Sequence, residues 1–214
     1  MRSVAGASQL VVVIHGGLWR HEWTADTTES IAVDLWRREV ATYNLEYRRL
    51  GLGGGWPESF ADIATALHKI PDLTGFSADR VVLLGHSAGA TMALWATHPG
   101  LTVAMAPFCD LAFARDRGLA DDTFARLLAE PLGHPAEYSP AHRLPRQGRA
   151  VVIASPADRL VPIDPIRRYV EMAREQNTAI DLVESDGRHF DLLEPSTSDW
   201  GLVIGELGAR KPPV

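Results

Sequence analysis

Short apolar runs alternate along the chain with longer segments whose apolar residues have helical spacing, and this alternation constrains the fold most. The predicted strands are Leu10–Ile14, Val40–Leu45, Arg80–Leu84, Leu101–Ala106, Val151–Ala154 and Ile180–Glu184. The predicted helices are Asp26–Arg38, Pro57–Ile70, Ala88–Thr97, Pro165–Glu175 and Ser198–Leu207. Apolar strands separated by helices are typical of a parallel sheet that is covered on both faces. The sequence therefore predicts an α/β fold with a mostly parallel sheet.

Residues 110–144 interrupt the alternation. The segment is charged and mixed, contains several prolines, and has one helical stretch around Asp122–Ala129. No internal repeat or long linker divides the chain, so we expect one domain over residues 1–214. We expect 110–144 to be a short lid-like insertion over the carboxyl edge of the sheet, where open α/β sheets bind ligands. The tail, residues 211–214, is expected to be disordered.

Composition and charge limit the classes of partner. The net charge of −6 disfavours nucleic acid and anionic membranes, which would repel an acidic protein. The apolar run Leu10–Ile14 is far shorter than the roughly 20 residues of a membrane-spanning helix. No targeting segment is visible, and the single cysteine, Cys109, cannot form an internal disulfide. We therefore expect a cytoplasmic protein that acts on a small molecule, with no nucleic-acid or membrane partner.

The sequence Gly85-His86-Ser87-Ala88-Gly89 is the sharpest chemical motif. It matches G-x-S-x-G and stands directly between a predicted strand and a predicted helix, which is the context that a nucleophile elbow requires. A serine on such a tight turn projects its hydroxyl above the sheet, and the following helix begins with partial positive charge. The motif predicts that Ser87 is a nucleophile; the competing interpretation is a helix-capping serine.

A second glycine-containing loop, His15-Gly16-Gly17-Leu18-Trp19, follows the first predicted strand. Acyl transfer needs backbone N–H groups that point at the developing oxyanion. We expect these from Gly17 and Leu18, with a third N–H from Ala88 beside the nucleophile. His15 is interpreted as a structural histidine that fixes the loop.

An acid and a base follow in the order that serine hydrolases of α/β type use. Asp158 comes one loop after the strand Val151–Ala154, and His189 one loop after Ile180–Glu184. Asp158 would orient the imidazole of His189, and His189 would take the proton of the nucleophile. Asp110 also follows a strand and is the alternative acid.

The remaining histidines match no metal-ligand spacing, and the run Gly53-Gly54-Gly55 lacks the context of a phosphate loop. We therefore expect no metal and no organic cofactor. Trp19, Trp56 and Phe108 are the expected aromatic walls of a substrate pocket, although large aromatic side chains are often simply part of the core.

Together these motifs resemble the kynurenine formamidase branch of the α/β-hydrolases, which grades into small carboxylesterases related to hormone-sensitive lipase. The resemblance rests on His15–Trp19, Asn44–Arg48, the Gly-His-Ser-Ala-Gly elbow, Asp158–Pro162 and His189–Asp191. It implies an α/β-hydrolase fold and hydrolysis of small carboxylic esters or aryl formamides without a cofactor. It also places the oxyanion hole at Gly17 and Leu18.

The chain departs from the family pattern at its amino terminus, where only nine residues precede the first predicted strand. We expect the amino-terminal strands to be truncated, which would leave Val40–Leu45 as an edge that a partner subunit could cover in a homodimer. A non-catalytic binding or scaffold protein on the same fold, and an acyltransferase or thioesterase with the same triad, are the alternative functions.

Overall fold

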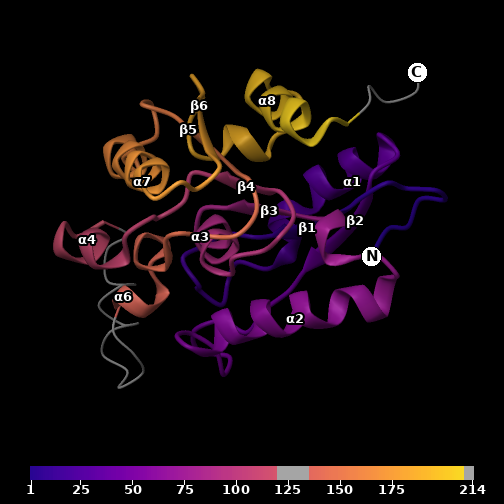
Figure 1. Cartoon of the computed structure of the whole chain (residues 1–214), viewed down its shortest axis with the longest axis horizontal. Helices are drawn as coiled ribbons and strands as arrows, with labels where there is room; N and C mark the ends of the chain where they lie inside the picture. Colours follow the sequence, from indigo (N-terminus) through magenta and orange to yellow (C-terminus); the bar gives the residue numbers. More distant parts are fainter. Residues whose placement is uncertain (120–134, 210–214) are drawn as a thin grey trace.

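A sheet of six parallel strands forms the centre of the molecule, in a computed structural model that describes residues 1–119 and 135–209 (Figure 1). The strands are β1 (Leu10–Ile14), β2 (Ala41–Leu45), β3 (Val81–His86), β4 (Thr102–Met105), β5 (Ala150–Ala154) and β6 (Ile180–Glu184). Their order across the sheet is β2-β1-β3-β4-β5-β6, and every neighbouring pair is parallel. The predicted parallel α/β architecture is thus confirmed.

Helices cover both faces of this sheet. They are α1 (Glu29–Arg37), α2 (Glu58–Thr74), α3 (Ala88–Trp95), α4 (Leu111–Asp116), α6 (Pro135–Tyr138), α7 (Ile163–Glu175) and α8 (Ser198–Leu207). Successive strand residues point to opposite faces, so Val11 and Val13 pack with α1 and α8, whereas Leu10 and Val12 pack with α2, α3 and α7. The two hydrophobic clusters lie between the sheet and these helices, and Figure 1 shows helices on both sides of the strands.

Of the predicted helices, α1 and α2 differ most in their limits from the structure. The segment predicted as Asp26–Arg38 begins with a 3-10 turn, Ala25–Thr28, before α1 starts at Glu29. Helix α2 continues four residues beyond Ile70 and ends where Gly75 adopts a left-handed conformation with φ of +78°. Within the predicted insertion, α4 and α6 are described, whereas the stretch around Asp122–Ala129 and the tail 211–214 lie outside the described residues.

Strand β2 lies at one edge of the sheet, as the sequence predicts for Val40–Leu45. Its outer side is partly paired by the chain itself, because Arg2 and Thr42 exchange two antiparallel backbone hydrogen bonds of 2.8 and 2.9 Å. The Arg2 guanidinium also pairs with the carboxylate of Glu29 on α1. The amino-terminal segment therefore occupies part of the edge for which a partner subunit was expected.

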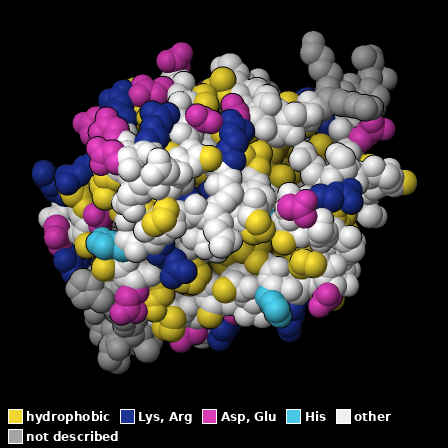
Figure 2. Space-filling view, viewed as in Figure 1, with side chains coloured by type: hydrophobic (Ala, Val, Ile, Leu, Met, Phe, Trp, Pro, Cys, Tyr) yellow, Lys and Arg dark blue, Asp and Glu magenta, His cyan; other side chains and the backbone are white. Residues whose placement is uncertain are grey.

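The surface carries mixed charge. Figure 2 shows acidic and basic side chains interspersed on one face, with hydrophobic side chains between them. Among residues 1–119 and 135–209, no helix is long and apolar enough to span a membrane.

Candidate active site

The residues predicted to carry chemistry follow strands that lie near one another in the sheet. Gly17 and Leu18 follow β1, Ser87 follows β3, Asp158 follows β5 and His189 follows β6. Because all six strands are parallel, these loops emerge at the same carboxyl edge. The topology thus brings together loops that are far apart in sequence, since Gly17 and His189 are separated by 172 positions.

Ser87 has the backbone conformation of a strained turn. Its φ is +53° and its ψ is −119°, which a residue with a side chain rarely adopts. Its N–H donates to the carbonyl of Met105 at 2.8 Å, which ties the turn to β4. The turn also needs Gly89, because a Cβ there would lie 2.1 Å from the carbonyl oxygen of Ile14. The structure therefore holds Ser87 between β3 and α3 in the manner of a nucleophile elbow.

Asp158 and His189 form a buried hydrogen-bonded pair. Nδ1 of His189 lies 2.7 Å from Oδ2 of Asp158, and both side chains are more than nine-tenths buried. The other oxygen of Asp158 accepts hydrogen bonds from the backbone N–H groups of Leu160 and Val161 at 2.8 and 3.0 Å. These contacts fix the carboxylate and, through it, the orientation of the imidazole.

The pKa of Asp158 lies below its ordinary value. Burial by itself would raise the pKa, but the hydrogen bond with His189 and those from the backbone of Val161 and Leu160 stabilise the anion more strongly. The carboxylate is therefore ionised at neutral pH and can stabilise positive charge on the neighbouring imidazole.

Ser87 and His189 line the same cavity, which has a volume of about 170 Å³. Within the described parts of the chain, Ser87 makes hydrogen bonds only through its backbone, so its hydroxyl is not engaged elsewhere. The residues that line the cavity are Gly17, Leu18, Arg20, Trp23, His86, Ser87, Phe108, Leu160, Val161, His189 and Phe190. Most of these side chains are apolar, which favours a substrate with an uncharged group at this point.

The expected oxyanion loop lies beside Ser87. Gly17 and Leu18 line the cavity, and Ala88 is the first residue of α3. The backbone N–H groups of these three residues donate no hydrogen bond to any residue that the structure describes. Gly17 has a φ of +103°, and a Cβ there would lie 2.2 Å from Cβ of Trp23. Three free N–H donors next to a serine are suited to binding an oxyanion.

His15 holds this loop in place, as expected for a structural histidine. Its side chain is fully buried, its Nε2 lies 2.8 Å from Oε1 of Glu46, and its ring stacks on Tyr47 at 4.3 Å between centroids. The Tyr47 hydroxyl in turn donates to the carbonyl of His15 at 3.0 Å. Residues directly after β2 thus support the loop that follows β1.

His86 is a further residue of the site that sequence reasoning missed. Its Nε2 lies 2.8 Å from the backbone carbonyl oxygen of His189, and the two rings lie 4.6 Å apart. Burial, together with the nearby His189, lowers the pKa of His86 to about 3, so the ring is neutral and donates this hydrogen bond. The residue before the nucleophile therefore anchors the backbone of the histidine loop. Its position at the carboxyl end of β3 was the only indication in the sequence.

The structure corrects two of the three expected aromatic walls. Trp19 and Trp56 are almost completely buried, pack edge to face at 5.5 Å, and belong to the core rather than to the cavity. Phe108 does line the cavity. Trp23 and Phe190 are the other aromatic walls; they stack at 6.3 Å and are 41% and 53% exposed, so they form part of the rim.

The alternative acid and the cysteine have other roles. Asp110 caps α4, where it accepts a hydrogen bond from the N–H of Phe113 at 3.0 Å. Cys109 is buried, and burial raises the pKa of its thiol well above the ordinary value, which disfavours the reactive thiolate. Among the described residues, no cluster of three or more potential ligands is arranged to hold a metal.

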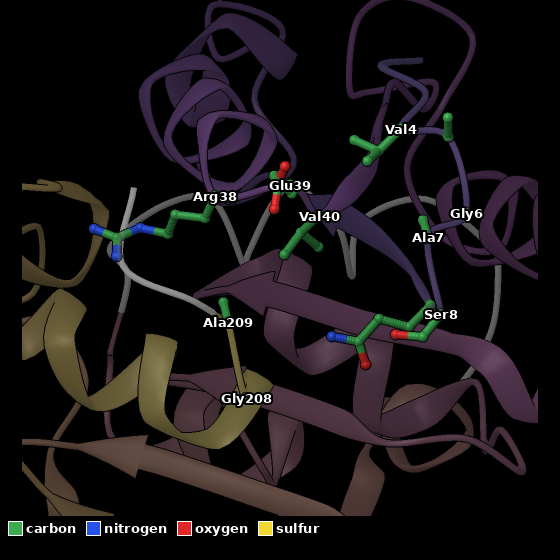
Figure 3. Close-up of a pocket in the computed structure, with 11 residues that line it drawn as sticks. Val4, Gly6, Ala7, Ser8, Arg38, Glu39, Val40, Gly208 and Ala209 are labelled. Atoms are coloured by element: carbon green, nitrogen blue, oxygen red, sulfur yellow. The ribbon is translucent and has the colours of Figure 1, made fainter. Parts of the chain in front are cut away.

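A separate cavity of about 330 Å³ lies away from these groups (Figure 3). It is bounded by the segment Val4–Gln9, the turn Arg38–Val40, and Gly208 and Ala209, which directly follow α8. The segment and the turn precede β1 and β2, which places them at the amino edge of the sheet, opposite Ser87. This cavity contains none of the predicted site residues.

Comparison with known proteins agrees with this architecture. The BD-FAE family model matches residues 2–105, slightly less than half of the 214 residues. No curated protein matches the chain. The native structure of esterase Est2 from Thermogutta terrifontis, a thermophilic planctomycete enzyme, is 18% identical with a TM-score of 0.77, and the match covers 97% of this chain and 86% of that one.

Two further solved structures are similar over most of the chain. Thermogutta terrifontis esterase 2 phosphonylated by sarin is 17% identical, with a TM-score of 0.79 and coverage of 99% of this chain and 90% of that one. An esterase/lipase from an uncultured bacterium is 18% identical, with a TM-score of 0.77 and coverage of 96% and 77%. With its open parallel sheet and its strand-turn-helix elbow at Ser87, this chain has the α/β-hydrolase fold.

Proposed function

We propose that the protein is a serine hydrolase that cleaves small carboxylic esters through an acyl-enzyme on Ser87. The observation that carries the proposal is the buried pair of His189 and Asp158, joined at 2.7 Å, with its imidazole on the same cavity as Ser87. The structural similarity to esterases supports the same reaction class. Aryl formamides are included as substrates because a formyl group is a small acyl group and aromatic side chains surround the cavity.

In the first half of the reaction, the Ser87 hydroxyl attacks the carbonyl carbon while His189 takes its proton. The N–H groups of Gly17, Leu18 and Ala88 stabilise the oxyanion that forms. His189, now an imidazolium next to the Asp158 carboxylate, gives the proton to the leaving oxygen or nitrogen. The bond to the leaving group breaks, and the acyl group remains on Ser87.

In the second half, water replaces the leaving group. His189 takes a proton from the water as its oxygen attacks the acyl carbon, and the same three N–H groups hold the second oxyanion. The proton then returns to Ser87 as the ester bond to the enzyme breaks. The products are a carboxylic acid and the free enzyme.

The size of the cavity favours a short acyl group. A volume of about 170 Å³ is below the range of roughly 300–1,000 Å³ that is typical of sites for drug-sized ligands. Phe108 and Val161 give the cavity apolar walls, which suit a short uncharged chain.

The proposal is tested with p-nitrophenyl acetate and the Ser87→Ala variant. We expect turnover by the wild type and its near-complete loss in Ser87→Ala, because the variant lacks the nucleophile but keeps the cavity. Mass spectrometry of wild type quenched during turnover should show an acetyl group on the peptide that contains Ser87. Turnover that survives the substitution would contradict the assignment.

The same assays separate the alternatives. A binding or scaffold protein on this fold would show no Ser87-dependent turnover of any ester. An acyltransferase would transfer the acetyl group to an added alcohol in preference to water, and a thioesterase would prefer the thioester of the same acyl group. Comparison of N-formylkynurenine with short-chain esters tests the formamide activity.

A further inference from the structure

A second cavity adjoins the one that contains Ser87. It has a volume of about 290 Å³ and is lined by Ala157, Arg159, Leu160, Arg188, His189 and Phe190. Three of these residues, Leu160, His189 and Phe190, also line the Ser87 cavity. The two cavities are therefore neighbours with a common wall, and that wall includes the proposed general base.

The two cavities differ in charge. The Ser87 cavity is mostly apolar, whereas the second cavity is lined by Arg159 and Arg188 and by no acidic residue. Within residues 1–119 and 135–209, neither guanidinium forms an ion pair or a hydrogen bond. Arg167 on α7, by contrast, pairs with both Asp164 and Glu184.

Unpaired cations beside a catalytic residue are notable in an acidic protein. The chain has a net charge of −6, yet two positive charges flank this cavity and are free to bind an anion. A guanidinium presents a planar set of N–H donors that matches the two oxygens of a carboxylate. The loops that carry the proposed acid and base, after β5 and β6, thus each contribute one cation to the cavity.

The order of the proposed reaction indicates which part of a substrate enters this cavity. The general acid must reach the leaving atom to protonate it, so the leaving group is the part of the substrate nearest His189. The second cavity is lined by His189 but not by Ser87 or the loop Gly17–Leu18, which face the carbonyl group in the proposed reaction. The cavity is therefore on the leaving-group side of the site.

We propose that Arg159 and Arg188 form a subsite for a carboxylate on the leaving group, so that the preferred substrates are small acyl esters of alcohols or phenols that bear a carboxylate. The proposal rests on the proposed hydrolase function and specifies its substrate class. The acyl group occupies the apolar cavity, and the charged end of the leaving group contacts the two arginines.

The test compares two esters that differ only at the charged group. 4-Acetoxybenzoate carries a carboxylate on its leaving group, and 4-acetoxybenzamide is a neutral analogue of similar size with the same acetyl group. Values of kcat/KM for both esters are measured for the wild type, Arg159→Gln, Arg188→Gln and the double variant. The ratio of the two values within each protein is the readout, and comparing that ratio between proteins removes the difference in intrinsic reactivity.

Arg37→Gln is the matched control for the single variants. Arg37 is exposed at the end of α1, a few residues before β2 begins, and so lies toward the opposite, amino edge of the sheet. The control removes the same charge from the protein but leaves the cavity intact. Thermal unfolding of all variants verifies that they remain folded.

We expect each single substitution to lower the ratio of kcat/KM for the anionic over the neutral ester by about threefold, and the double substitution by about tenfold, as for exposed ion pairs. Arg37→Gln should leave the ratio unchanged. The wild-type preference for the benzoate should also weaken as ionic strength rises, because salt screens exposed charges. The double variant should have lost this salt dependence.

Two outcomes would overturn the inference, and they are distinguishable. If the wild type hydrolyses p-nitrophenyl acetate in a Ser87-dependent way, but the ratio does not change in the double variant, the subsite is wrong and the hydrolase function stands. If Ser87→Ala retains full activity on p-nitrophenyl acetate, the hydrolase function is wrong and the subsite falls with it.

Discussion

The buried ring of His86 should make the folded protein sensitive to mild acid. The pKa of His86 is about 3 in the folded chain and 6.5 in the unfolded chain, because burial and the neighbouring His189 disfavour the protonated ring. Between these two values the unfolded chain binds more protons than the folded chain, so stability falls as the pH falls. Above pH 6.5 the ring is neutral in both states, so its protonation no longer lowers the free energy of unfolding.

The pKa difference sets the magnitude. Lowering the pH from 7 to 4.5 should remove about 2.5 kcal/mol of the free energy of unfolding through His86 alone. The variant His86→Gln lacks this titration but keeps an N–H donor for the carbonyl of His189. Its stability should therefore decline less steeply with pH. His15 and His98, whose pKa values burial also lowers, titrate in both proteins and cancel in the comparison.

Urea unfolding followed by tryptophan fluorescence, at several pH values between 4.5 and 7, measures this difference. The wild type should lose about 2.5 kcal/mol more than His86→Gln over that range. The variant itself should be less stable at pH 7, because a glutamine side chain lacks the ring that packs against His189. Parallel curves of unfolding free energy against pH for the two proteins would refute the reasoning, since they would mean that His86 does not resist protonation in the fold.

Three further substitutions test the site. Asp158→Asn should lower kcat about 10⁴-fold, as loss of the acid does in other triads, whereas Asp110→Asn should leave kcat unchanged because that side chain caps a helix. Trp19→Ala should destabilise the fold by about 3–5 kcal/mol in urea unfolding, because the ring is fully buried in the core. Gly17→Ala should reduce kcat about 10²-fold to 10³-fold in steady-state assays, because the added Cβ would meet Trp23 and displace the oxyanion loop.

The architecture could be predicted because its determinants are local. Apolar strands and helical spacing alternate regularly, and parallel strands carry the loops that follow them to one edge. That rule alone places the loops of Ser87, Asp158 and His189 together. The limits of α1 and α2 could be predicted less well from the sequence. Hydrophobic periodicity does not show that a 3-10 turn precedes α1 or that α2 continues through Pro71.

The walls of the cavity could not be predicted, because they depend on the direction in which each loop turns. Leu18 and Trp19 both have left-handed backbone angles, with φ of +52° and +57°. These angles reverse the chain, so that Trp19 enters the core and Trp23 reaches the cavity instead. The contact between His86 and the backbone of His189 is equally inaccessible to sequence, since it joins residues 103 positions apart.

The pairing of Arg2 with Thr42 has a practical consequence for handling the protein. A strand edge with free amide and carbonyl groups recruits strands from other molecules, and here the first residues of the chain occupy part of that edge. Deleting them would expose β2 at the flank of the sheet, away from Ser87. The first sign of such a deletion should be self-association that grows with protein concentration, visible in light scattering while the chemistry of each monomer is still intact.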